Sequence, residues 1–140
     1  MSSQIQFLCS PGAKLPSRES SESAGYDISC ISDGVIEPGV QCLVDTGLRW
    51  SAPPGYVMIL KGRSGIEKRG IYVHAGVIDS DYRGPIKVMM KNDSDKIFEM
   101  KTGDRIAQGI ILRLPEINVV QVESLDDTVR GEGGFGSTGR

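Results

Sequence analysis

The chain has 140 residues, of which 39% are hydrophobic and 24% are charged, and its net charge is −2. These proportions fit one globular domain, and the charge excludes a broad surface for duplex DNA but not a small phosphate site. No apolar run approaches the ~20 residues that cross a bilayer, and the N-terminus lacks the pattern of a signal peptide. We expect an intracellular protein, of the cytoplasm and/or nucleus, that binds neither nucleic acid nor membranes.

The apolar segments are short and evenly spaced, because 18 glycines and 7 prolines interrupt any helical stripe. Hairpin turns are expected at Glu37 to Gly39 and at Asn92 to Asp95, and one short helix at Ser64 to Arg69. The pattern predicts an all-β sandwich, jelly roll or barrel. The expected strands are Ile5 to Leu8, Tyr26 to Ser29, Gln41 to Val44, Tyr56 to Leu60, Ile71 to Val73, Val77 to Asp79, Ile86 to Met90, Ile106 to Leu112 and Asn118 to Val122.

Two segments near the C-terminus stand out. Ile106 to Leu112 is almost continuously apolar, which predicts burial on both faces, one of them against another subunit. Asp126 to Arg140 is rich in glycine and poor in apolar side chains, so it cannot bury enough surface to offset its ordering entropy. We therefore expect a β domain over residues 1–125 and a mobile arm over residues 126–140.

The cysteines and the only histidine are expected to be structural. Cys9, Cys30 and Cys42 leave one thiol unpaired under any intramolecular disulfide scheme, and their spacing matches no zinc pattern. We expect reduced thiols in or near the core. His74 is interpreted as a structural or partly exposed strand residue rather than a catalytic one.

Two segments carry groups suited to a nucleotide. In residues 130–139, glycine N–H groups, two hydroxyls, the Arg130 guanidinium and the Phe135 ring suit a polyphosphate, although composition alone favours a plain linker. In residues 76–86, Asp79 ends an apolar strand and could act as a general base on water. The alternative for this segment is a hairpin whose turn acids are simply solvated.

Three shorter pieces are Ala24 to Ile28, Gly62 to Gly65 and Gly103 to Gln108. The second places Arg63 and Ser64 before the candidate helix, where free N–H groups favour phosphate, although Ser64 could equally be a plain N-cap. From the residues alone, the first and third are a strand start and a turn into a buried strand.

These five pieces, in this order, resemble the five motifs of the homotrimeric dUTPases. The resemblance runs from about Ala24 to the end of the chain, and its most specific part is Gly76 to Gly84. It implies a distorted β jelly roll, a homotrimer with composite active sites, and Mg²⁺-dependent hydrolysis of dUTP to dUMP and pyrophosphate. That reaction keeps uracil out of DNA and supplies dUMP for thymidylate synthesis.

The resemblance also implies roles for single residues. Asp79 would activate the water that attacks the α-phosphorus, and Gln108 would contact the α-phosphate and this water. Tyr82 would form the floor under the deoxyribose and exclude a ribose 2′-hydroxyl, while Asp27 would meet water molecules of the bound magnesium. The other expected substrate-binding residues are Arg63, Ser64, Gly65, Gly76, Val77, Ile78, Ile86, Lys87, Arg130, Phe135, Gly136, Ser137 and Thr138.

The chain departs from the family pattern at two positions. Gly65 stands where many relatives carry a second serine, and Pro85 removes a backbone donor beside the segment that would read uracil. Two alternatives stay open. One is a dCTP deaminase or bifunctional deaminase–dUTPase, which would need a catalytic glutamate where Asp79 stands. The other is a catalytically silent, dUTPase-derived binding protein, for which degenerate motifs would be expected.

Overall fold

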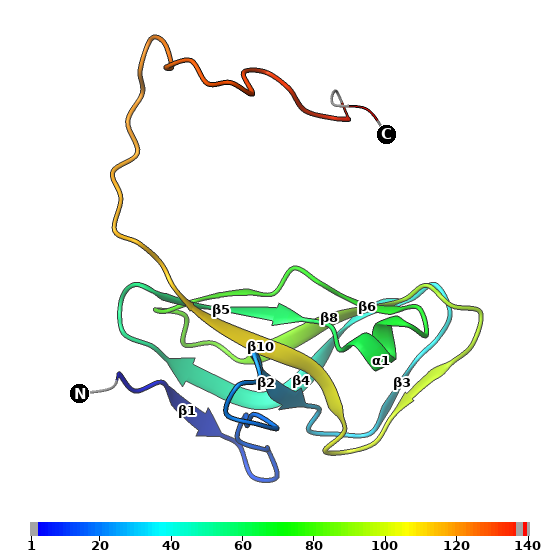
Figure 1. Ribbon diagram of the computed structural model, residues 1–140. Helices are drawn as coiled ribbons and strands as arrows, with labels where there is room; N and C mark the ends of the chain where they lie inside the picture. The colour runs from blue at the N-terminus through cyan, green and yellow to red at the C-terminus, as the bar shows by residue number, and fades with distance from the viewer. Residues whose placement is uncertain (1–2, 137–138, 140) are drawn as a thin grey trace.

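The computed structural model describes residues 3–136 and 139, and this part of the chain folds into a β domain followed by an extended C-terminal segment (Figure 1). Its only helix is α1 (Ser64–Glu67). The strands are β1 (Gln6–Cys9), β2 (Gly25–Ser29), β3 (Gly34–Ile36), β4 (Gln41–Ser51), β5 (Tyr56–Lys61), β6 (Ile71–His74), β7 (Val77–Asp79), β8 (Ile86–Asn92), β9 (Phe98–Met100) and β10 (Arg105–Arg113).

The strands form two four-stranded sheets and a small ribbon, and all the pairings within them are antiparallel. One sheet has the order β1-β4-β8-β6 and the other β2-β10-β5-β7, while β3 pairs with β9. Neighbours in each sheet are mostly distant in sequence, as crossing connections of a jelly roll require. The predicted all-β class with one short helix is confirmed.

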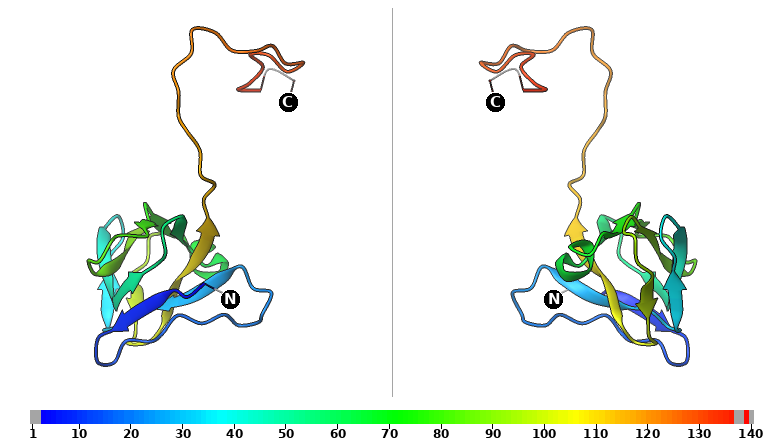
Figure 2. Two further views of the ribbon diagram at one scale, coloured as in Figure 1. Left: turned by 90° about the vertical axis from the view of Figure 1, so that its left-hand side faces the viewer. Right: turned by 90° about the vertical axis from the view of Figure 1, so that its right-hand side faces the viewer.

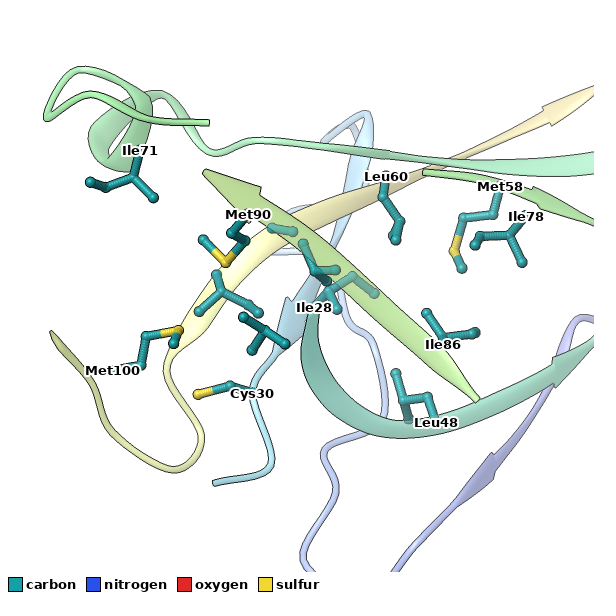
Figure 3. Close-up of a cluster of buried hydrophobic side chains, with 14 of the residues drawn as sticks. Ile28, Cys30, Leu48, Met58, Leu60, Ile71, Ile78, Ile86, Met90 and Met100 are labelled. Carbon is teal, nitrogen blue, oxygen red and sulfur yellow. The ribbon is translucent and has the colours of Figure 1, made fainter. Parts of the chain in front are cut away.

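The core lies between the two sheets. Residues alternate between buried and exposed along β4 and β8, so each of these strands turns one apolar face inward. Ile28 and Leu60 from one sheet meet Leu48, Ile86 and Met90 from the other in a single cluster (Figure 3). This packing fixes the strand ends from which the functional loops project.

Several sequence expectations fail for a common reason, which is that sequence neighbours join different sheets. The segment after β3 is a turn, closed by Val40 N–H donating to Glu37 O at 3.1 Å, and the segment after β8 is a bend. Neither forms a hairpin, because β3 pairs with β9 and β8 pairs with β4 and β6. Residues 76–86 are likewise no hairpin, since β7 pairs only with β5.

The predicted Asn118 to Val122 strand is wrong as well. It lies extended and exposed, with no neighbouring strand to complete its hydrogen bonds.

The continuous apolar strand was expected to be buried on both faces, but within this chain only its first half is. Ile106 and Ala107 are fully buried, whereas Ile110 and Ile111 are partly exposed and Leu112 is exposed. The second half of β10 pairs with β5 and then leaves the domain (Figure 1). Its partly exposed apolar side chains are therefore available for contact with another chain.

The C-terminal segment departs from the β domain at the end of β10, and both side views show it standing away from the sheets (Figure 2). Among the described residues, its last backbone hydrogen bond to the domain runs from Leu114 N–H to Gly55 O, at 2.7 Å. Beyond it, the described hydrogen bonds link only residues of the segment itself. The boundary between domain and arm at residues 125 and 126 stays a prediction.

The cysteines are free, but they do not all lie in or near the core as expected. Cys30 is buried, and its Sγ–H donates to Lys101 O at 3.1 Å. Burial raises the pKa of Cys30 and of the half-buried Cys42, which keeps both thiols protonated. Cys9 is exposed, because β1 is an edge strand whose side chain at this position faces out.

Candidate active site

The first, second and fourth motifs meet in one cavity of about 510 Å³, a size in the usual range for ligand sites. The start of β2, the turn before α1 and the middle of β10 supply its walls. The expected residues that line it are Asp27, Arg63, Ser64, Gly65 and Gln108, together with Ala24, Gly25 and Ile66, and with Glu19 and Ser23 from the preceding loop.

Two glycines allow these motifs to come together. A Cβ on Gly25 would collide with the Gln108 side chain, and a Cβ on Gly62 would collide with Glu67. With both positions clear, the Gln108 amide Nε2 donates to Gly62 O at 2.9 Å and joins β10 to the turn before α1. This hydrogen bond orients the other end of the Gln108 amide, an acceptor, within the cavity.

The cavity is electrostatically mixed. Asp27 lies between two guanidinium groups, with its carboxylate oxygens 3.8 Å from Arg63 Nε and 3.5 Å from Arg105 Nη1. Arg105 also lies 3.7 Å from the largely exposed Glu19 carboxylate. The Arg63 side chain donates a further hydrogen bond to Arg105 O at 3.2 Å. These contacts hold two cations at the rim, where they can meet a polyphosphate.

Helix α1 presents its amino end to the same cavity. Arg63 is the N-cap and no side-chain hydrogen bond caps the helix, so the alternative role of Ser64 as an N-cap is not seen. Ser64 and Gly65 are exposed, and a Cβ on Gly65 would meet no atom within 4 Å. The Ser64 hydroxyl and the first N–H groups of α1 are therefore open to a ligand.

The donor set fits magnesium held mainly by phosphate and water. Within residues 3–136 and 139, no group of three or more His, Cys, Asp or Glu side chains could hold a metal ion. Asp27 and Glu19 are the carboxylates at this cavity. Magnesium needs no protein cage, since it keeps several waters and bridges substrate phosphates beside one or two carboxylates.

The third motif forms a second, separate cavity of about 340 Å³. Val77, Ile78, Asp79, Tyr82 and Lys87 line it, with Leu43 and Pro85 completing the wall. Asp79 ends β7 with its side chain exposed, and it forms no ion pair with any residue in the described part of the chain. A free carboxylate therefore stands beside an apolar and aromatic cavity.

A tight local fold positions Tyr82 over this cavity. Its hydroxyl donates to Pro85 O at 2.8 Å, and its ring lies so close to Gly84 that a Cβ there would fall 2.5 Å from the hydroxyl oxygen. The Tyr82 N–H donates to Asp79 O at 3.1 Å. Pro85, which removes a donor, thus contributes an acceptor that fixes the ring.

Gly76 and Ile86 support the third motif without lining the cavity. Gly76 has φ 93°, and a Cβ there would lie 2.9 Å from Leu60 O, so only glycine fits where β7 meets β5. The Ile86 side chain is fully buried in the core, and its carbonyl accepts a hydrogen bond from Thr46 Oγ1 at 2.6 Å. His74 lies exposed at the end of β6 and lines neither cavity.

The fifth motif reaches neither cavity within this chain. Arg130 Nε donates to Gly133 O at 2.7 Å in a local turn, and the Phe135 ring is fully exposed. Gly136 has φ 81° and is exposed as well. The expected contacts of Ser137 and Thr138 lie outside the described residues.

The two cavities lie at different places along one sheet. Gln108 pairs with Lys61 on one side of β5, while Asp79 pairs with Val57 on its other side. Four residues along the strand and two strand spacings across it separate the Cα atoms of Gln108 and Asp79 by roughly 16 Å. The Gln108 amide is held on Gly62, so no single water can contact both side chains of one chain.

Comparison with known proteins identifies the family. The dUTPase family model matches residues 12–139. The deoxyuridine 5′-triphosphate nucleotidohydrolase of Nautilia profundicola is 45% identical and covers 91% of this chain and 92% of its own length. The protein of that name from Yarrowia lipolytica is 46% identical and covers 99% and 90%. The chain belongs to the dUTPase family.

Solved structures agree with this assignment. A mutant dUTPase of Staphylococcus bacteriophage 80alpha, determined with dUpNHpp, superposes with a TM-score of 0.91 at 29% identity and covers 98% of this chain and 99% of its own. A phage phi11 dUTPase mutant with a structural Mg(II) ion gives a TM-score of 0.82 at 26% identity, with coverage of 89% and 99%. The predicted family and enzyme class, a dUTP nucleotidohydrolase, are confirmed, which disfavours the deaminase alternative.

The sequence pointed to most of the residues that line the two cavities but not to all of them. Glu19, Ser23 and Leu43 line the cavities although none lies in a motif. Trp50 was also missed, although its indole contacts the backbone of Asp79. From the sequence, a single tryptophan is interpreted as a core residue, and only the hydrogen bond of its Nε1 in the structure distinguishes it.

No helix in residues 3–136 is long and apolar enough to span a membrane.

Proposed function

We propose that the chain hydrolyses dUTP at composite sites, each built from the Asp79 cavity of one copy and the phosphate cavity of another. The observation that carries this proposal is the separation of roughly 16 Å between Asp79 and Gln108 within one chain. Both residues are needed at the same water, so a second copy must supply one of them. The homotrimer implied by the family resemblance provides such a pairing.

In the proposed reaction, Asp79 accepts a proton from a water molecule as the water oxygen attacks the α-phosphorus. A new phosphorus–oxygen bond forms, and the bond from the α-phosphorus to the bridging oxygen breaks. Pyrophosphate leaves with that electron pair, and dUMP remains. The free, exposed carboxylate of Asp79 beside the cavity supports this role, since a general base must reach its water within hydrogen-bond distance.

The Asp79 cavity is suited to the deoxyuridine part of dUTP. Tyr82, held by Pro85 O, would carry the deoxyribose on its ring and leave no room for a 2′-hydroxyl. The backbone of Val77 and Ile78, beside the exposed Leu43, would read uracil. A base that left buried polar groups unpaired would be rejected by about 3 to 5 kcal/mol.

The phosphate cavity is suited to the triphosphate. Arg63 supplies a guanidinium, Ser64 a hydroxyl and Gly65 a backbone N–H, while Gln108 would orient the α-phosphate and the attacking water. Asp27 would accept hydrogen bonds from water molecules of a magnesium ion. The two neighbouring arginines hold its partly buried carboxylate in place for this role. When bound, magnesium offsets the negative charge of the phosphate oxygens.

The C-terminal arm would close the site of another copy. Arg130 and Phe135 make no contact with either cavity of their own chain, and the arm leaves the domain at the end of β10, next to the start of β5 (Figure 1). Bound over the substrate, Phe135 would stack on uracil and Arg130 would meet the triphosphate, while Gly136, Ser137 and Thr138 would add further donors. Closure would exclude bulk water and strengthen these contacts.

Product analysis tests the proposed substrate. The protein is incubated with Mg²⁺ and, separately, with dUTP, dCTP, dTTP and UTP. We expect dUMP and pyrophosphate from dUTP alone. Ammonia from dCTP would identify a deaminase, and no turnover of any nucleotide would favour a silent binding protein.

Substitution of Asp79 tests the proposed base. Asp79→Asn keeps the size of the side chain and removes its basicity, so turnover should fall by ~10²- to 10⁴-fold while a non-hydrolysable dUTP analogue still binds. Asp81→Asn is the matched control, because Asp81 is exposed two residues away and lines neither cavity. Normal turnover by Asp79→Asn would remove Asp79 from the mechanism.

Deletion of residues 130–140 tests the arm. The truncated chain should keep its thermal stability, because these residues make no described contact with the β domain. Its turnover should be nearly lost, since the closed site cannot form. Full activity of the truncated chain would refute closure by the arm.

A further inference from the structure

Trp50 is the only tryptophan of the chain, and it is 2% exposed near the end of β4. Its indole Nε1–H donates to the backbone oxygen of Asp79 at 3.0 Å. The Phe7 ring from β1 lies against it, with ring centroids 6.2 Å apart. A buried indole N–H needs an acceptor, and here the acceptor belongs to the proposed catalytic base.

The same oxygen also serves Tyr82. Its two lone pairs accept the indole N–H of Trp50 and the backbone N–H of Tyr82, the latter at 3.1 Å. One carbonyl therefore links the proposed base, the proposed sugar floor and the core. A change in the indole contact would be transmitted to both functional residues.

Little else fixes this carbonyl. Asp79 is the last residue of the three-residue strand β7, which lies at the edge of its sheet and pairs only with β5. Beyond it, the end of β4 braces the following turn through Ala52 N–H to Ser80 O at 3.4 Å, and through Arg49 Nη1 to Arg83 O at 2.9 Å. Among the described contacts, Trp50 provides the one side-chain hydrogen bond to the Asp79 backbone.

We propose that Trp50 is a positioning residue of the dUTPase reaction, whose indole N–H sets the backbone of Asp79 and Tyr82. This inference rests on the proposed role of Asp79 as the base. Trp50 does not touch the substrate. It acts by holding a carboxylate whose displacement by about 1 Å would slow catalysis by up to ~10²-fold.

The effect should fall on turnover and on sugar discrimination rather than on affinity. The phosphate contacts come from Arg63, Ser64 and Gln108 in the other cavity, so KM for dUTP should change by less than about three-fold. A loosened Tyr82 ring would admit the 2′-hydroxyl more easily, so the ratio of kcat/KM for dUTP to that for UTP should fall.

The experiment removes the N–H and keeps the packing. Trp50→Phe is the first variant. The second is the wild-type sequence produced with a tryptophan isostere in which sulfur replaces the indole N–H, which alters this residue alone because the chain has one tryptophan. Ile36→Val is the control, since it trims a fully buried side chain on β3 and breaks no contact with Asp79.

We expect kcat to fall by roughly 10- to 100-fold in both altered proteins and to stay unchanged in the control. An unchanged kcat in the isostere protein, or an equal loss in Ile36→Val, overturns the inference. Asp79→Asn is assayed in parallel. If it retains turnover, the proposed base fails; if it is inactive while the isostere protein is fully active, only the role of Trp50 fails.

Discussion

Mixing two inactive variants should restore activity, because each proposed composite site would take its two cavities from different chains. Asp79→Asn destroys the proposed base and leaves the phosphate cavity intact. Gln108→Ala does the reverse. The two residues pair with opposite ends of β5 and lie roughly 16 Å apart, so neither substitution disturbs the other cavity in the same chain.

The size of the restoration follows from counting. If the proposed trimers assemble at random from equal amounts of both variants, a site is intact only when its Asp79 comes from a Gln108→Ala chain and its Gln108 from an Asp79→Asn chain. Each condition holds for half of the chains, so about a quarter of the sites regain both residues. The mixture should therefore reach about a quarter of wild-type turnover, far above the sum of its parents.

The assay measures pyrophosphate release after the two variants are unfolded together in denaturant and refolded together. Refolding each variant alone and mixing them afterwards is the control, in which exchange between assembled trimers is absent and activity should stay at the parental level. If co-refolded chains are no more active than this control, each site lies within one chain and the composite site is wrong.

Three further predictions concern single positions. In a denaturant titration, Gly76→Ala should lower the free energy of unfolding by about 1 to 3 kcal/mol, a larger loss than for Gly12→Ala. Both glycines have φ near 90°, but only at Gly76 would a Cβ collide with a neighbouring strand. Gly65→Ser meets open space, so calorimetry should show an unchanged fold and dUTP-analogue binding tightened by up to about five-fold through the added hydroxyl. Hydrogen bonds from the Thr102 N–H and hydroxyl lower the pKa of Asp33. Wild type should therefore melt at a higher temperature than Asp33→Asn when the pH is above the ordinary pKa of a carboxyl group. This difference in melting temperature should vanish as the pH falls through the lowered pKa of Asp33.

Sequence patterns predicted the strands well where side chains alternate or form an apolar run. The segments at Tyr56 to Leu60 and Val77 to Asp79 were located almost to the residue, and the short helix was found at Ser64. What the patterns could not predict was pairing, because the energy of a strand depends on its neighbour across the sheet. Asn118 to Val122 has the composition of a strand and no neighbour within this chain.

The motifs indicated candidate residues, and the resemblance implied that these residues meet in composite sites of a homotrimer. Within one chain the fold places Asp79 and Gln108 roughly 16 Å apart along β5. This separation follows from the register of three strands, β10, β5 and β7, which depends on packing throughout the domain. The motifs therefore indicate which side chains could do the chemistry, and the register adds the distance on which the proposed site between two chains rests.

The glycines of the motifs show why a short sequence pattern can identify a member of this family. Four of them, Gly25, Gly62, Gly76 and Gly84, leave no space for a side chain, because a Cβ at each would collide with a neighbouring group. At Gly25 that neighbour is the Gln108 side chain, and at Gly84 it is the Tyr82 ring. These two positions are fixed by the space that a candidate site side chain occupies, while Gly62 and Gly76 are fixed by Glu67 and Leu60. A motif such as the segment around Asp79 thus combines candidate functional residues with glycines that leave space for their side chains. Both kinds of residue must be present for the site to form.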